Sequence, residues 1–265
     1  TAAKTINLGR TADGSLQFNL GTTATALVLT AGTLNIDQAN VTVGSGGTIT
    51  RTAGTLNATP TVTNVNVTYT PGASIAAGPE MPAALGSGSL LLSATAGTTT
   101  FSNPISFTAG GITITSGSAT FDGAISFNAG ASAAPPGFIN SGTGTVAVNG
   151  GITWTTYGGQ NFAVAPIDND GGTFTIASAV NFVHTTTGGT GADVSGAVIT
   201  NSGAGTLTIA SLTHTGNKLD GAGTTWNTTV GVANASTGSL TFTGSATVRG
   251  TATNASTGKL TFAGG

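Results

Sequence analysis

Carboxylates are the side chains of this sequence that could perform acid–base chemistry. A glycosidase or polysaccharide lyase needs two or more of them close together, with a basic partner. Only Asp168 and Asp170 are close in sequence, but Asn169-Asp170-Gly171-Gly172 is typical of a turn and no Lys or Arg lies near it. We therefore interpret this pair as a solvated turn and expect no catalytic residue. The full set is Asp13, Asp37, Glu80, Asp122, Asp168, Asp170, Asp193 and Asp220.

Metal ligands are equally sparse. Cysteine is absent and His184 and His214 are the only histidines, so a transition-metal site would lack ligands. Asp168-Asn-Asp-Gly matches the opening of a calcium loop, but the twelfth position is Ala179 instead of glutamate. Gly188 to Asp193 matches the start of a calcium-binding nonapeptide, yet its eighth position is Ser195 and the motif occurs once. We expect no metal and no cofactor.

Charge is unusually low, and this limits the possible partners. Charged residues make up 5% of the chain, against roughly 25% in an ordinary soluble domain. The net charge is −2, and no Lys or Arg lies between residues 52 and 217. A nucleic-acid interface would need a basic patch, so we expect no nucleic-acid partner. No apolar run approaches the roughly 20 residues of a membrane-spanning helix, so we expect no membrane span.

The elements that would position any site are predicted to be strands. Apolar and polar residues alternate with period two, as in Thr113-Ile-Thr115 and Leu240-Thr-Phe242, while Glu, Lys, Arg, Met and Gln are scarce. Short β-branched runs are interrupted by Gly and Asn, which is typical of strands separated by turns. The sequence therefore predicts an all-β protein.

A repeat unit organises these strands. It reads Asn or Asp, three or four small residues, then polar–apolar–x–apolar, and its last two copies are nearly identical. A second short strand often follows, as in Phe121-Asp-Gly-Ala-Ile125-Ser-Phe127. Strand, tight corner and strand is the pattern of a solenoid coil. The copies are Asn140 to Val148, Asp168 to Ile176, Asn201 to Ile209, Asn234 to Phe242 and Asn254 to Phe262.

The predicted fold is a parallel β-helix, or β-solenoid, forming one elongated unit over residues 1–265. Coils of about 20 to 25 residues would stack at the strand spacing of roughly 4.8 Å, giving about 11 to 13 coils. Irregular repeat spacing predicts loops that protrude at residues 71–84, 129–138 and 157–170. The alternative is a pair of tandem β-sandwich domains, whose strands would recur at similar intervals.

One stretch carries a family resemblance. Val67-Thr-Tyr-Thr70, Gly78-Pro-Glu-Met-Pro82 and Leu90-Leu-Leu92 together resemble a segment of long, repetitive bacterial surface proteins of the kind exported by type IX secretion. Met81 stands where that family usually has leucine. The resemblance implies a cell-surface or extracellular location and a structural or adhesive role, and it transfers no catalytic residue. Because the chain starts at Thr1 without methionine, we expect it to be part of a longer product.

The sequence therefore favours an extracellular structural or adhesive protein that is not an enzyme. We expect it to be a subunit of a filament, sheath or stalk that assembles with itself through end-to-end or strand-addition contacts. Low charge removes the repulsion that keeps monomers apart. The alternative is a β-helical carbohydrate-binding or polysaccharide-degrading protein.

Surface chemistry suggests two further partners. Surface glycans or glycosylation are suggested by six Asn-x-Ser/Thr sequons, which begin at Asn40, Asn57, Asn66, Asn227, Asn234 and Asn254. Binding to ice or a crystal surface is suggested by Thr-x-Thr pairs. That role requires the pairs at constant period on one flat face, and their intervals along the sequence are irregular. The pairs considered are Thr48/Thr50, Thr113/Thr115 and Thr206/Thr208.

Overall fold

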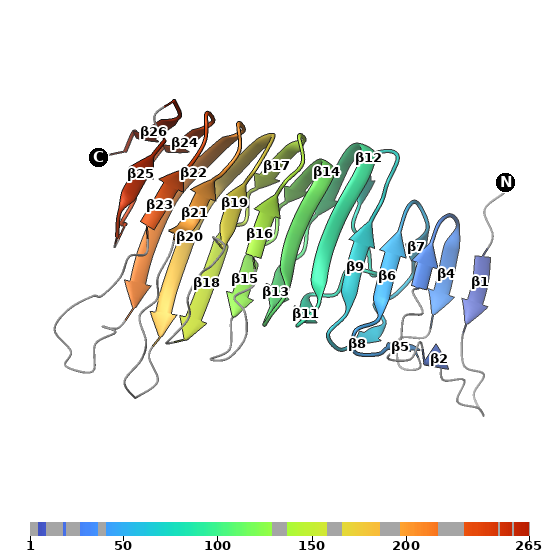
Figure 1. Cartoon of the computed structure of the whole chain (residues 1–265). Coiled ribbons are helices and arrows are strands. Elements are labelled where there is room, and N and C mark those ends of the chain that lie inside the picture. Colours follow the sequence, from blue (N-terminus) through green and yellow to red (C-terminus); the bar gives the residue numbers. More distant parts are fainter. Residues whose placement is uncertain are drawn as a thin grey trace.

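The chain folds into a parallel β-helix, as the sequence predicts (Figure 1). The computed structural model describes residues 5–8, 18–19, 27–36, 41–128, 137–157, 166–185, 197–216, 231–248, 250–255 and 257–264. All strand pairings printed for these residues are parallel, from β1 with β4 to β24 with β26. Tandem β-sandwiches are built from antiparallel sheets, so this topology rules out the alternative fold.

Each coil crosses three faces in the same order. Face 1 carries ten stacked strands among the described residues. They are β3 (Leu27–Leu29), β6 (Thr48–Arg51), β9 (Asn66–Tyr69), the first parts of β12 (Ser89–Phe101) and β14 (Gly111–Phe121), β16 (Gly137–Asn140), β19 (Ile167–Asn169), β21 (Ala197–Asn201), β23 (Gly231–Asn234) and β25 (Ala252–Asn254).

Face 2 follows face 1 after a corner. In the first coils it is formed by β1 (Thr5–Leu8), β4 (Thr33–Ile36) and β7 (Thr55–Leu56), which pair in that order. It continues with β10 (Ile75–Ala76), the second parts of β12 and β14, β17 (Thr145–Val148), the first parts of β20 (Thr173–Thr185) and β22 (Thr206–Gly216), β24 (Ser239–Phe242) and β26 (Lys259–Phe262). Four strands are long enough to turn a corner, so they belong to two faces each.

Face 3 closes each coil. It begins with β2 (Phe18–Asn19), β5 (Val41–Val43) and β8 (Thr61–Val62). It continues with β11 (Ala84–Gly86), β13 (Ile105–Phe107), β15 (Ile125–Asn128), β18 (Ile152–Tyr157) and the second parts of β20 and β22.

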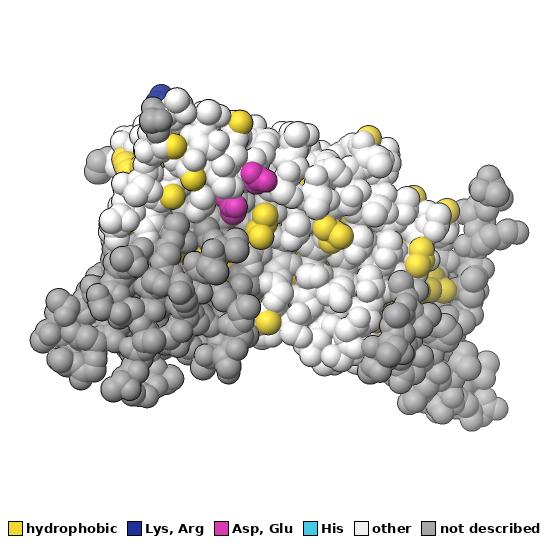
Figure 2. All heavy atoms as spheres, in the orientation of Figure 1, with side chains coloured by type: hydrophobic (Ala, Val, Ile, Leu, Met, Phe, Trp, Pro, Cys, Tyr) yellow, Lys and Arg dark blue, Asp and Glu magenta, His cyan; other side chains and the backbone are white. Residues whose placement is uncertain are grey.

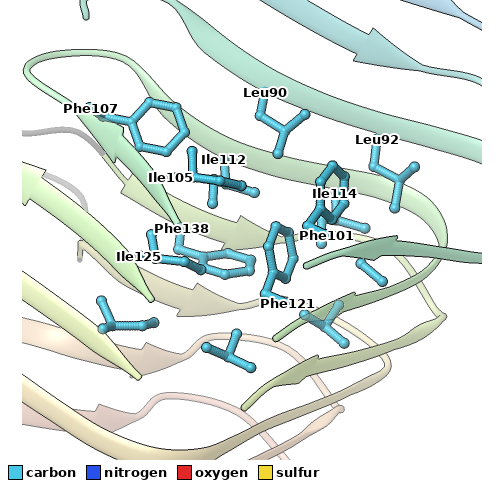
Figure 3. Close-up of a cluster of buried hydrophobic side chains, with 14 of the residues drawn as sticks. Leu90, Leu92, Phe101, Ile105, Phe107, Ile112, Ile114, Phe121, Ile125 and Phe138 are labelled. Atoms are coloured by element: carbon cyan, nitrogen blue, oxygen red, sulfur yellow. The ribbon is translucent and has the colours of Figure 1, made fainter. Parts of the chain in front are cut away.

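Alternation with period two explains the core. On every face one set of side chains points into the coil and stacks on the equivalent residues above and below, and these buried residues form a single cluster. Figure 3 shows this packing, with Phe101 and Phe121 lying against each other and Leu90, Leu92, Ile112 and Ile114 projecting inward from face 1. Face 3 carries an aromatic column in which Phe107, Phe127, Trp154 and Phe182 stack in succession. Because no single coil can bury these side chains, stacking supplies most of the stability.

Coil length varies more than the sequence suggested. Thr48 pairs with Asn66, 18 residues along the chain, whereas Ile199 pairs with Val232, 33 residues along. The longer coils account for ten strands on face 1 where 11 to 13 coils were expected. Between residues 98 and 242, four segments lie outside the described residues, and all four join face 3 to face 1.

The predicted loops relate to the coils as follows. Residues 71–84 include β10, and within them Glu80 and Met81 are buried, so this segment forms part of a coil. Most of the second and third predicted loops, residues 129–136 and 158–165, lies outside the described residues. The ends of those two predictions fall in strands β16, β18 and β19.

The repeat corresponds to one corner of the coil. Each copy contains the end of a face 1 strand, the corner and a face 2 strand. The second copy is shifted by one residue from its prediction, because Asn169 pairs with Asn140 while Asp168 pairs with Ile139. The corner after Asn169 is one residue shorter than the corner after Asn140, so the sequence alignment had matched the wrong residue.

Candidate functional site

A single inward column on face 1 contains most of the buried polar chemistry of the described chain. It consists of the last inward residue of each face 1 strand, stacked in register. The column is polar near both ends and apolar between them. In order it runs Leu29, Arg51, Tyr69, Leu92, Ile114, Asn140, Asn169, Asn201, Asn234 and Asn254.

The first polar part is a cluster of Arg51, Tyr69 and Glu80, here called the Arg51 cluster. Arg51 and Tyr69 are neighbours on β6 and β9, and Glu80 reaches them from the segment between faces 2 and 3. The Arg51 guanidinium forms an ion pair with Glu80 Oε1, and the Tyr69 hydroxyl donates to the same oxygen over 2.8 Å. The backbone N–H of Gly78 also donates to Glu80 Oε1, and Arg51 donates to the carbonyl of Ala76.

Burial makes this cluster structurally demanding. Arg51 is 5% exposed and Glu80 and Tyr69 are fully buried. Removing two charges from water costs several kcal/mol per ion, so the pair is stable only while both partners and their hydrogen bonds are present. Burial, followed by the nearby Glu80 carboxylate, raises the pKa of Tyr69 well above its ordinary value, so Tyr69 stays protonated and remains a donor.

The chemistry of the Arg51 cluster is that of a clamp. Its interactions fix the Gly78-Pro-Glu-Met-Pro82 segment against the interior, and the Tyr69 ring packs edge-on against Phe101. Glu80 thus has a structural position, in keeping with the resemblance, which assigns it no catalytic role. Sequence reasoning did not pair Glu80 with Arg51, because the two are 29 residues apart and no local pattern connects them.

The second polar part is a ladder of five asparagines, Asn140, Asn169, Asn201, Asn234 and Asn254, here called the asparagine column. Each Nδ2 donates to Oδ1 of the next asparagine over 2.8 to 2.9 Å. The Nδ2 groups of Asn201, Asn234 and Asn254 also donate to the carbonyl four residues later, inside their own corner. The sequence predicted asparagines that bond corner backbones, but it did not predict that they bond one another inside the rod.

The asparagine column has a direction. All its Nδ2 donors point to the C-terminal neighbour and all its Oδ1 acceptors to the N-terminal one. Below its first member stands Ile114, which has nothing to donate, and Asn140 Oδ1 is therefore buried without a partner. Polar ladders of this kind strengthen when every member is satisfied.

The acidic pair considered for catalysis lies at the surface beside the column. Asp168 is on the outer side of β19 and accepts hydrogen bonds from the Ser202 backbone N–H and hydroxyl. Partial burial raises its pKa, while the bonds from Ser202 oppose that rise. Asp170 follows in an exposed turn, as predicted. No basic side chain is recorded in contact with Asp168, so the acid–base pair that a glycosidase or lyase needs is not assembled there.

The remaining candidates do not converge on a site. His214 is buried against Phe182 at the end of the aromatic column, and the side chain of His184 lies outside the described residues. In the described part of the chain no group of three His, Cys, Asp or Glu side chains could hold a metal ion. Among the sequons, Asn234 is 1% exposed because it belongs to the asparagine column, so it is inaccessible in the folded chain.

Comparisons with known proteins identify no relative. No family model matches the chain, and neither the curated proteins nor the solved structures contain a significant match. Within the described ranges, no helix is long and apolar enough to cross a membrane.

Proposed function

We propose that this chain is an extracellular structural or adhesive element with no catalytic activity, built as a rod that assembles with copies of itself. The observation that supports the proposal is the continuous stack: the side-chain columns of faces 1 and 2 run in register as far as β25 and β26. Such a fold extends by adding coils without changing any contact already made.

The proposed contact joins opposite ends of two copies by strand addition. In the described residues β26 pairs only with β24, and β1 pairs only with β4. Both edge strands alternate polar and apolar residues, as Lys-Leu-Thr-Phe in β26 and Thr-Ile-Asn-Leu in β1. Phe262 stacks on Phe242 but is 47% exposed, so a strand added beyond β26 would cover an aromatic ring.

Low charge favours this association. The visible surface in Figure 2 is largely uncharged, with isolated hydrophobic groups and few charged side chains. Little electrostatic repulsion therefore opposes the approach of two copies. The extracellular location rests on the resemblance to repetitive surface proteins.

The test is to image the purified 265-residue chain by electron microscopy and to follow its assembly by light scattering. We expect fibres or end-to-end oligomers. The variant F262D places a charge at the proposed contact and should prevent elongation. V28D is the matched control, because Val28 is the other large exposed hydrophobic residue and lies on the outer side of β3. A chain that stays monomeric at high concentration, or equal inhibition by both variants, would contradict the proposal.

The alternative, a β-helical protein that binds or degrades polysaccharide, gains no specific support from the described carboxylates. Glu80 is neutralised inside the rod, and Asp122 accepts a hydrogen bond from Asn149 at a corner. A screen of neutral and acidic polysaccharides that detects product would favour this alternative over the structural role.

A further inference from the structure

The outer surface of face 2 carries two aligned columns of hydroxyl side chains. They occupy the first and third positions of seven successive strand segments, from β12 to β26. The first column is Thr98, Ser118, Thr145, Thr173, Thr206, Ser239 and Lys259, and the second is Thr100, Thr120, Ala147, Thr175, Thr208, Thr241 and Thr261. We call these fourteen positions the threonine array.

Parallel pairing makes the array periodic although the sequence intervals are not. Thr120 and Ala147 are 27 residues apart and Thr175 and Thr208 are 33 apart, yet both pairs are direct neighbours across strands. Extra residues between them are placed in other parts of the coil. The sequence argument against a regular threonine surface therefore does not hold for face 2. Of the three pairs considered in the sequence, only Thr206/Thr208 belongs to the array.

The hydroxyls of the second column are available to a ligand. None of its residues is buried, and Thr100, Thr120, Thr175, Thr208, Thr241 and Thr261 make no hydrogen bond from their side chains within the described chain. Threonines at the corners behave differently: Thr52 bonds Thr70, and Thr115 donates to the carbonyl of Leu92. The second column thus presents unpartnered hydroxyls beside methyl groups at a fixed repeat.

The array is also accessible and nearly uncharged. Between residues 98 and 242 the four undescribed segments join face 3 to face 1, so none begins or ends on face 2. Lys259, at the last strand, is the only charged residue of the array. Face 1 lacks this uniformity, because its outer positions include Leu91, Ile139 and Asp168.

We propose that the threonine array binds the surface of ice. Neighbouring strands repeat at about 4.8 Å and alternate residues of one strand at about 6.7 Å. These two repeats are close to the spacings of water oxygens on a prism face of hexagonal ice. Hydroxyls at those spacings can hydrogen-bond an ordered water layer, and the methyl groups beside them restrict the water between columns.

Crystalline polysaccharide fits the array less well. Flat sugar surfaces are recognised largely by aromatic rings that stack on them, and every aromatic side chain of these face 2 strands occupies an inward position. The proposal is independent of self-assembly, since it needs only one folded copy.

The experiment measures thermal hysteresis and inhibition of ice recrystallisation by the monomer fraction of the 265-residue chain. We expect both activities in the unchanged chain. T208Y, at the centre of the second column, should abolish them because a large ring disrupts the repeat. T213Y is the matched control: it lies on the same strand, β22, but is exposed on face 3, and it should retain both activities. Circular dichroism checks that each variant is folded.

Three results would overturn the proposal. The first is a folded chain without thermal hysteresis or recrystallisation inhibition. The second is equal loss in T208Y and T213Y. The third is binding of insoluble cellulose or chitin, or dimerisation, that T208Y abolishes while ice activity is absent, which would assign the array to a sugar lattice or to a second copy.

Discussion

At the residue scale, the Arg51 cluster shows how one buried charge determines the conformation of a distant segment. Arg51 occupies an inward position where neighbouring coils have Leu29 and Tyr69. The coil beyond it supplies Glu80, whose carboxylate accepts bonds from Arg51, Tyr69 and Gly78. Residues 71–84 therefore remain against the interior because releasing them would leave a buried guanidinium without its counter-ion.

The first prediction concerns this ion pair. E80A should destabilise the chain by about 3–5 kcal/mol, because it leaves Arg51 charged and buried without its partner. The double variant R51M/E80M should recover most of that loss, since neither charge is then buried. Urea unfolding followed by circular dichroism measures both. D122A, which removes an exposed carboxylate, is the control and should unfold like the unchanged chain.

The second prediction concerns alkaline pH. Because the pKa of Tyr69 is raised on folding, the native state keeps a proton that the unfolded chain releases near pH 10. The stabilisation is therefore complete below about pH 10 and decreases as pH rises above it. Y69F removes this dependence, while costing about 1–3 kcal/mol at neutral pH through the lost bond to Glu80. Unfolding free energies at pH 7 to 11 measure it, and an unchanged alkaline slope in Y69F would count against it.

The sequence could predict only part of the residue-scale picture. Alternation identified the inward strand residues, for example Phe121 and Phe127, because period two follows directly from strand geometry. It could not pair Arg51 with Glu80 or place Asn169 above Asn140, since those contacts depend on coil length, and coil length is set by corners without a fixed sequence pattern.

At the element scale, the asparagine column fixes the corner between faces 1 and 2. Each asparagine satisfies carbonyls of its own corner while bonding the asparagines of adjacent coils. Close backbone approach accompanies it: a Cβ on Gly203 would lie 1.5 Å from the carbonyl oxygen of Asp170, so only glycine fits that corner.

The third prediction tests the ladder. N201L removes the acceptor of Asn169 and the donor to Asn234, both buried, and should cost about 2–6 kcal/mol, or about 1–3 kcal/mol for each unsatisfied group. N254L changes the exposed last member of the column and should cost much less. Equal losses in the two variants, measured by chemical denaturation, would show that burial and position in the ladder are irrelevant.

The fourth prediction uses the unsatisfied start of the column. I114N places an amide below Asn140, whose Oδ1 is buried without a donor. The new hydrogen bond should offset much of the lost apolar burial, so I114N should be more stable than I114A. The order of their melting temperatures decides the matter, and a less stable I114N would contradict a ladder that can be extended.

At the scale of the whole molecule, the coil is the unit of stability. Coils contact only their neighbours, so removing one complete coil preserves every remaining type of contact. The sequence predicted this architecture correctly from its repeats, but not the three faces, because β12, β14, β20 and β22 continue through a corner without a break in their alternation.

The fifth prediction is that deletion of residues 90–111, one coil, leaves a folded protein. Ile112 then takes the place of Leu90 beside Val67, in the same register. Deletion of residues 90–100 removes half a coil and should prevent folding, because a face 2 strand would follow a face 1 strand without a corner. Circular dichroism and the cooperativity of thermal unfolding distinguish the two variants. Similar behaviour of both would contradict the coil as the unit.

The near identity of the last two copies has a consequence for how such a gene could change. Asn234 to Phe242 and Asn254 to Phe262 stack directly, so a tandem duplication of 20 codons would insert one coil and leave the register intact. Copy number of that stretch could therefore vary between lineages without loss of folding, and natural selection could adjust the length of the rod in single steps.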